Sequence, residues 1–80
     1  MEYRFEPERQ RSAVYDAGTC IGECHYSAGS GAWIIDHTEV DPAYGGRGIA
    51  RRLVEMVAQE AQARGIQVIP LCSYAVKVLS

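Results

Sequence analysis

Apolar residues in the second half of the chain recur with the period of an α-helix. Ile49, Leu53, Val57 and Ala61 follow one another four residues apart, which places them on one helical face. Charged and amide side chains between them fall mostly on the opposite, solvent-facing side. Gly65 follows the last apolar position, where a left-handed helix cap is expected. The pattern predicts one amphipathic helix that packs on a sheet and ends before Gly65.

The first half of the chain alternates between β-forming and turn-forming segments. Strands are expected at residues 3–6, 12–15, 20–27 and 32–39. The segments between them, rich in turn-forming or charged residues, lie at 7–10, 16–19 and 28–31. Strands that follow one another through such short turns predict an antiparallel meander.

Residues 66–69 are expected to form a short buried strand after the helix, and Pro70 is expected to end it. A strand reached through a helical crossover should run parallel to strand 32–39. Residues 72–79 are expected to form a final helix that begins near the carboxyl ends of these two strands, where α/β sheets bind ligands. The expected fold class is mixed α/β (α+β), a mainly antiparallel twisted sheet with one long and one short helix.

Eighty residues predict one small domain that spans residues 1–80. A chain of this length buries only about 60% of its unfolded surface, so its stability is marginal. A hydrophobic share of 48% is normal for a globular domain. The formal net charge of −2 argues against broad nucleic-acid binding, and the positive charge that bears on function is local.

The sequence also predicts where the protein resides. No apolar run approaches the length that spans a membrane, and the N-terminus does not resemble a signal peptide. The three cysteines include no C-x-x-C pair, which favours a reducing setting over a disulfide framework. We therefore expect a cytoplasmic protein that does not bind membranes.

Three glycines in four residues stand between strand 32–39 and the long helix. Gly45, Gly46 and Gly48 allow a tight turn that points several backbone N–H groups inward. The first turn of the following helix adds its own unpaired N–H groups and the positive end of the helix dipole. Together these groups predict a seat for a phosphate or pyrophosphate.

Arginines at the start of the helix strengthen this prediction. Arg47, Arg51 and Arg52 place positive charge where the helix dipole is already positive, which costs stability unless an anion lies nearby. The alternative is that they point into water and pair with Glu55 one turn later. The glycines and arginines together favour anion binding.

Cys72 is the first candidate for covalent chemistry. It lies at the expected junction between strand 66–69 and the final helix. A helix N-terminus favours the thiolate form of a cysteine, which could accept an acyl group. The alternative is that Cys72 is a small buried hydrophobic residue.

His37 is the candidate general base, since imidazole accepts protons near neutral pH. Strand alternation groups His37 with Ile35 and Glu39 on one face, and Asp36 with Thr38 on the other. The alternative is a structural histidine held by a hydrogen bond. Glu39 is a second candidate base, or else a solvated carboxylate.

A metal site is not expected. Cys20 and Cys24 are four residues apart on one strand and should share a face, close to His25. No second pair of ligands accompanies them, so this signal for a metal is weak. Tyr74 and Lys77 on the final helix could contact a ligand or form the rim of an amphipathic helix.

The motifs of common nucleotide sites, G-x-x-x-x-G-K-S/T and G-x-G-x-x-G, are absent. The segment V-D-P-A-Y-G-G-R-G-I-A instead resembles motif A of the GCN5-related N-acetyltransferases, in which a strand enters a Gln/Arg-x-x-Gly-x-Gly/Ala loop. Gly48 and Ala50 match its last two fixed positions, whereas Gly45 stands where Gln or Arg is usual. With HTEV before the loop and LCSYA after the next strand, residues 32–78 resemble the small single-domain branch of this family.

The resemblance implies a minimal version of the family's fold with acetyl-CoA as cofactor. The pantetheine arm would lie along strand 32–39, beside Glu39 and Val40. The pyrophosphate would take backbone amides of the loop and helix start. The expected cofactor-binding residues are Glu39, Val40, Gly45, Gly46, Arg47, Gly48, Ile49, Ala50, Arg51 and Tyr74.

Two departures from the family pattern bear on function. The larger enzymes carry two acceptor-binding helices between the first two strands, but Glu6–Arg11 is long enough only for a turn. The acceptor site is therefore open, or is completed by a partner or a second copy of the chain. Leu79 stands where those enzymes often have a tyrosine acid, and Cys72 stands near an asparagine that contacts pantetheine.

The expected function is transfer of an acetyl group from acetyl-CoA to an amine. In a direct route, His37 deprotonates the amine and amides near Val40 polarise the thioester carbonyl. In a two-step route, Cys72 first accepts the acetyl group, and the sequence favours His37 and Cys72 acting together. The alternatives are a non-catalytic CoA- or acyl-CoA-binding module or subunit, and a structural domain whose loop binds nothing specific. The acceptor, a small molecule or a protein, is not defined, and the expected state is a monomer or weak homodimer.

Overall fold

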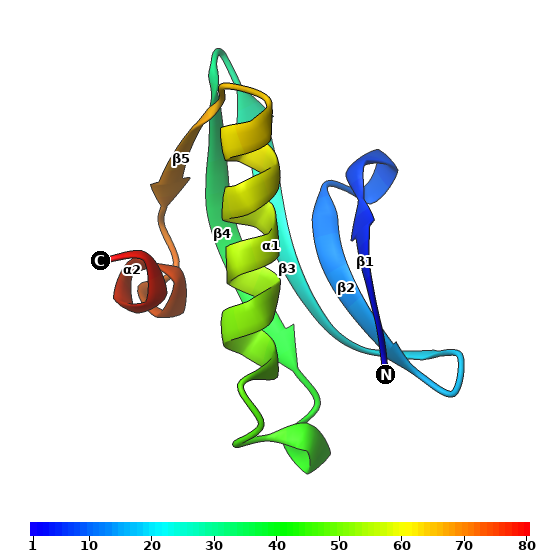
Figure 1. The fold of residues 1–80 in the computed structure, drawn as a ribbon. Coiled ribbons are helices and arrows are strands. Elements are labelled where there is room, and N and C mark those ends of the chain that lie inside the picture. The colour runs from blue at the N-terminus through cyan, green and yellow to red at the C-terminus, as the bar shows by residue number, and fades with distance from the viewer.

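The computed structural model describes all 80 residues as five strands, two α-helices and two short 3-10 turns (Figure 1). The strands are β1 (Glu2–Glu6), β2 (Arg11–Asp16), β3 (Thr19–Gly29), β4 (Ala32–Val40) and β5 (Gln67–Pro70). The helices are α1 (Ile49–Ala63) and α2 (Ser73–Leu79), and the 3-10 turns are η1 (Pro7–Arg9) and η2 (Pro42–Tyr44). The predicted fold class is confirmed. Neither α-helix is both long and apolar enough to cross a membrane.

The five strands form one sheet in the order β1-β2-β3-β4-β5. The first four make the predicted antiparallel meander, and β5 pairs parallel to β4 because α1 carries the chain back between them. Strand β5 does end at Pro70, which is its final residue and lies opposite Ile35. The strand is not buried as expected, because it lies at the edge of the sheet, and Ile69 is 41% exposed. Proline is tolerated there because β5 is an edge strand and needs no N–H on its free side.

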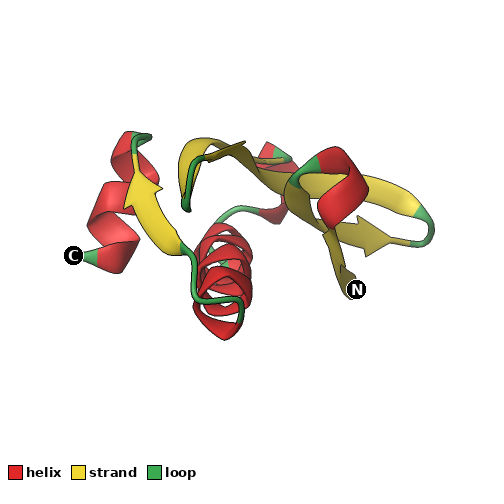
Figure 2. Ribbon diagram, turned by 90° about the horizontal axis from the view of Figure 1, so that it is seen from above, coloured by secondary structure: helices red, strands yellow, loops and turns green.

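Helix α1 packs against one face of the sheet, as its apolar period predicts. Leu53, Val57 and Ala61 are fully buried against it. Farther along the same face, the rings of Tyr26 and Trp33 stack with their centroids 4.1 Å apart. We call this side the inner face, and the side away from α1 the outer face; Figure 2 shows α1 on one side of the sheet only. The outer face of β2, β3 and β4 carries Arg11, Glu23, His25, Asp36, His37 and Glu39.

A β-bulge at Asp36 changes the side-chain pattern of β4. His25 pairs with His37 and Tyr26 pairs with Ile35, so Asp36 has no register partner on β3. Strict alternation fails at such an extra residue, because two successive side chains then stay on one side.

The bulge makes one prediction about β4 wrong. His37 shares the outer face with Glu39 but not with Ile35, which is fully buried on the inner face. Asp36 and Thr38 do not share a face either, because Asp36 lies on the outer face and Thr38 contacts the buried Cys24 on the inner face. The sequence shows no sign of the extra residue that reverses the pattern.

A second bulge corrects the prediction for the cysteines. The register of β2 on β3 shifts at Ile21, between Cys20 and Cys24. Cys20 is exposed on the outer face, whereas Cys24 is fully buried in the core. The two thiols therefore do not share a face, and no group of three metal-ligating side chains forms.

Candidate active site

The glycine-rich loop between η2 and α1 has the backbone that its sequence predicts. Gly46 and Gly48 have φ angles of 75° and 72°, a left-handed conformation that glycine adopts without strain. Gly48 is the N-cap of α1 and offers no side-chain cap. Helical bonding begins with the Arg52 N–H, which donates to the Gly48 carbonyl at 3.1 Å. The N–H groups of Ile49, Ala50 and Arg51 therefore have no helical partner and are free for an anion.

The three arginines beside this loop have different surroundings. Arg51 pairs with Glu55 at 3.3 Å, so for this arginine the sequence-based alternative of an exposed ion pair is the one observed. The guanidinium of Arg52 lies over the Tyr3 ring, 4.1 Å from its centroid, and so packs against the sheet. Arg47 lies over the Tyr44 ring at 5.6 Å and has no carboxylate partner. Arg47 is therefore the arginine best placed to meet an anion at the loop.

Strands β4 and β5 separate directly after Ile35 (Figure 1). The Ile35 carbonyl accepts hydrogen bonds from the N–H groups of Leu71 (2.9 Å) and Cys72 (3.1 Å). Beyond that point β4 continues to Val40, whereas the other chain segment turns into α2. The β5-side edge of β4 from Asp36 to Val40, which includes Glu39, thus has no strand partner and can accept an extended ligand.

Cys72 lies at this point of separation. It is the N-cap of α2, and its Sγ accepts a hydrogen bond from the Ala75 N–H at 3.3 Å. The hydroxyl of Thr38 lies 3.6 Å from the same sulfur and 3.5 Å from the Sγ of Cys24. Burial raises the pKa of Cys24 to about 11, so Cys24 remains a neutral thiol. Sequence reasoning missed Thr38, because its position beside both cysteines depends on the bulge in β4.

His37 lies on the opposite side of β4 from Cys72. Its Nε2 is 3.1 Å from the Oε1 of Glu39, and both side chains are well exposed. Thr38, the next residue, points to the inner face and contacts Cys72. The structure therefore does not bring His37 and Cys72 together. Tyr74, the other predicted contact near Cys72, lies in the first turn of α2 with 37% of its surface exposed.

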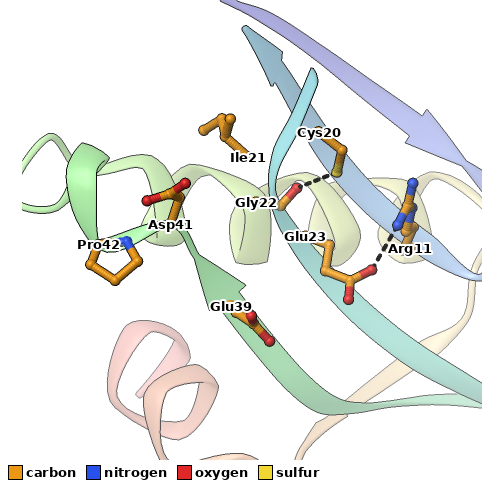
Figure 3. A pocket seen from close by; sticks show the side chains of 8 residues that line it. All are labelled: Arg11, Cys20, Ile21, Gly22, Glu23, Glu39, Asp41 and Pro42. Carbon is orange, nitrogen blue, oxygen red and sulfur yellow. Dashed lines mark hydrogen bonds and ion pairs between the residues drawn. The ribbon is translucent and has the colours of Figure 1, made fainter. Parts of the chain in front are cut away.

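A depression of about 360 Å³ lies on the outer face where β4 ends (Figure 3). Glu23 and Glu39 face each other across β3 and β4, and Asp41 adds a third carboxylate. Arg11 enters from β2 and pairs with Glu23 at 2.8 Å. Its hydrogen bonds to carboxylates outweigh the effect of burial and raise the pKa of Arg11. Sequence reasoning missed this depression because its residues come from three strands whose pairing was unknown.

The structure thus combines, in one mixed α/β fold, a glycine loop at a helix start and an open strand edge beside it. The family model for GCN5-related N-acetyl-transferases matches residues 10–80. The chain belongs to the GCN5-related N-acetyltransferase family. No curated protein sequence matches the chain.

Solved structures of acetyltransferases share this fold. A GCN5-related N-acetyltransferase from Sphaerobacter thermophilus matches 72% of the chain at 29% identity, with a TM-score of 0.64. An aminoglycoside acetyltransferase from an uncultured soil metagenomic sample (24% identity, TM-score 0.61) and an acetyltransferase from Trypanosoma brucei (19%, 0.59) each match 84% of it. The matched regions are 19%, 49% and 56% of those three chains, so this chain spans less than two thirds of each of them.

Proposed function

We propose that the chain transfers an acetyl group from acetyl-CoA to an amine. Membership of an acetyltransferase family supports acyl transfer to an amine. The observation that best supports acetyl-CoA as the acetyl donor is the open edge of β4 after Ile35. This edge leads directly to the unpaired amides of the loop before α1. An extended thioester ligand with a pyrophosphate at one end matches this combination of features.

In this proposal the ligand has two regions of contact. The pyrophosphate binds amides between Gly45 and Arg51, with Arg47 supplying positive charge. The pantetheine arm follows the free edge of β4 past Glu39 and Val40, and Tyr74 borders it from α2. The complete proposed set is Glu39, Val40, Gly45, Gly46, Arg47, Gly48, Ile49, Ala50, Arg51 and Tyr74.

The direct route uses His37 as proton acceptor on the outer face. The amine nitrogen bonds to the acetyl carbon, the carbon–sulfur bond breaks, and the CoA thiolate takes up a proton. An amide near Val40 stabilises the oxyanion that forms between these events. The carboxylates around the outer depression favour an acceptor that arrives as a cation, because no other element covers that face.

An acetyl-cysteine route is the second candidate. Cys72 is half-buried beside the open edge of β4, within reach of a thioester placed there. Because Cys72 and His37 lie on opposite sides of β4, His37 is badly placed to activate the thiol. We therefore propose direct transfer first and the acetyl-cysteine second, in place of the joint action expected from the sequence.

Intact mass and release of free CoA test these routes together. The chain, Cys72→Ala and His37→Ala are each mixed with acetyl-CoA, with and without a panel of primary amines. Direct transfer predicts CoA release that requires an amine, no change in protein mass, and a loss of rate of about 10²-fold or more in His37→Ala. A gain of one acetyl group that disappears only in Cys72→Ala would identify the covalent route. Binding of acetyl-CoA without release under any condition would leave the non-catalytic module as the function.

A further inference from the structure

The two histidines of the chain lie directly opposite each other on the outer face. His25 on β3 is the register partner of His37 on β4. Directly opposed residues in an antiparallel pair have Cβ atoms only about 5 Å apart, so one small ligand can meet both imidazoles. Sequence reasoning considered His25 only as a metal ligand.

His25 is held more firmly than His37. Its Nδ1 lies 2.8 Å from the Oδ1 of Asp36, and the Ser27 hydroxyl donates to the other oxygen of that carboxylate at 2.6 Å. The side chains of His25 and Asp36 are 38% and 31% exposed, whereas those of His37 and Glu39 are 53% and 71% exposed. The less exposed pair loses less of its interaction to water.

The state of Asp36 decides which nitrogen of His25 is free. Burial would raise the pKa of Asp36, but hydrogen bonds from Ser27 and His25 outweigh burial and hold that pKa below its usual range. An ionised carboxylate only accepts hydrogen bonds, so the Nδ1 of His25 must carry the proton. The Nε2 atom of neutral His25 then carries no proton, and its lone pair can accept one.

Asp36 also places His25 near the proposed reaction. It is the bulge residue that follows Ile35, the last residue of β4 to pair with β5. The open edge of β4 begins there, so the His25–Asp36 pair adjoins the proposed thioester site on its outer side.

The charged and titratable neighbours of His25 come from the two strands that flank β3. Arg11 on β2 is its register partner, but that guanidinium is already bound by Glu6 and Glu23. His37 faces it from β4, and Asp36 bonds it directly. No helix covers this part of the outer face (Figure 2).

We propose that His25 is a second proton acceptor in the transfer, with Asp36 as its positioning residue; this inference rests on the proposed acetyl transfer to an amine. An acceptor that arrives as an ammonium ion sheds two protons before it is an amide. One leaves before the nitrogen–carbon bond forms, and the other leaves as the carbon–sulfur bond breaks. His25 and His37 each take one of them; one then neutralises the CoA thiolate, and the other passes to water.

The tautomer of His25 is the first test and requires no activity. In ¹⁵N-labelled chain at about pH 8, where an ordinary imidazole is neutral, the inference predicts protonated Nδ1 and unprotonated Nε2 on His25. Asp36→Asn should reverse this, because the side-chain oxygen of the new amide accepts from Ser27 and its NH₂ group then donates to Nδ1. Ser27→Ala in that background frees the amide to turn its oxygen toward Nδ1 and should restore the original tautomer. A protonated Nε2 in the unaltered chain would overturn the inference, whatever its activity.

The pH dependence of kcat is the second test, at saturating acetyl-CoA and primary amine. If both imidazoles must be neutral, log kcat should rise with a slope of about two at low pH, and about one in His25→Gln or His37→Gln. Each single variant should lose about 10²-fold in rate. A His25→Gln variant with an unchanged slope and a rate within about twofold of the original chain would show that His25 is structural, while His37→Gln alone would still test the proposed function.

Discussion

The two faces of β4 differ sharply, although one strand of nine residues supplies both. The inner face contributes Ile35, which is fully buried, and Thr38, which contacts two thiols. The outer face contributes His37 and Glu39, which are open to solvent. Burial of apolar surface stabilises the chain, whereas exposed ion pairs contribute little. This small fold therefore buries apolar side chains on one side of the sheet and leaves titratable side chains exposed on the other.

Removal of a buried side chain should give the largest effect on stability. Leu53 is fully buried between α1 and the sheet, so Leu53→Ala should cost about 2–5 kcal/mol through lost burial and a cavity. His37→Ala on the outer face should change the free energy of unfolding by no more than about 0.5 kcal/mol. Urea denaturation followed by circular dichroism measures both. Equal losses would show that the outer face also stabilises the fold.

Two glycines allow the effect of backbone strain on stability to be measured separately from an effect on CoA binding. Gly48 in the loop and Gly18 in the β2–β3 turn both have positive φ, 72° and 83°, and both have open space around the missing side chain. Alanine at either position should cost about 1–2 kcal/mol of stability. Only Gly48→Ala should also weaken CoA binding, by about tenfold or more, because it disturbs the amides at the start of α1. Isothermal titration with CoA would contradict the proposed seat if the two variants bound equally well.

Acid should unfold the chain partly through Asp36. A carboxyl whose pKa is lowered by folding adds stability above its unfolded value of about 3.9, and that stability is lost as the pH falls through the folded value. Asp36→Asn should therefore show a shallower loss of stability below about pH 5 than the original chain. Urea midpoints across this range provide the measurement. Glu8→Gln, which alters an exposed carboxyl without an ion pair, should leave the acid profile unchanged.

The two ends of α1 provide the smallest contrast. Arg51 at the start forms an exposed pair with Glu55, so Arg51→Gln should cost only about 0.3–0.5 kcal/mol. Arg64 at the end packs over the rings of Phe5 and Trp33, so Arg64→Gln should cost somewhat more, about 0.5–1 kcal/mol. CoA affinity should show the opposite order, falling only in Arg51→Gln. A loss of affinity in Arg64→Gln would mean that the whole helix, not its N-terminus, attracts the ligand.

The long helix and the glycine loop were predictable because their signals are local. The spacing from Ile49 to Ala61 depends only on helical period, and the glycines mark positions that need a left-handed backbone. The faces of β4 were not predictable, because the bulge at Asp36 adds a residue without any change in composition. The contact between His25 and Asp36 was missed for the same reason, since it depends on the register of two strands.

The uncapped start of α1 also has a consequence for hydrogen exchange. Amides at Ile49, Ala50 and Arg51 lack intrahelical acceptors, so their protons should exchange with solvent deuterium almost as fast as in an unstructured peptide. The next amide, at Arg52, is bonded to Gly48 and should exchange more slowly. A ligand whose phosphates occupy the loop would protect the three fast amides without altering those deeper in the helix. The deuterium uptake of one short peptide would thus report occupancy of the site separately from any chemistry that follows.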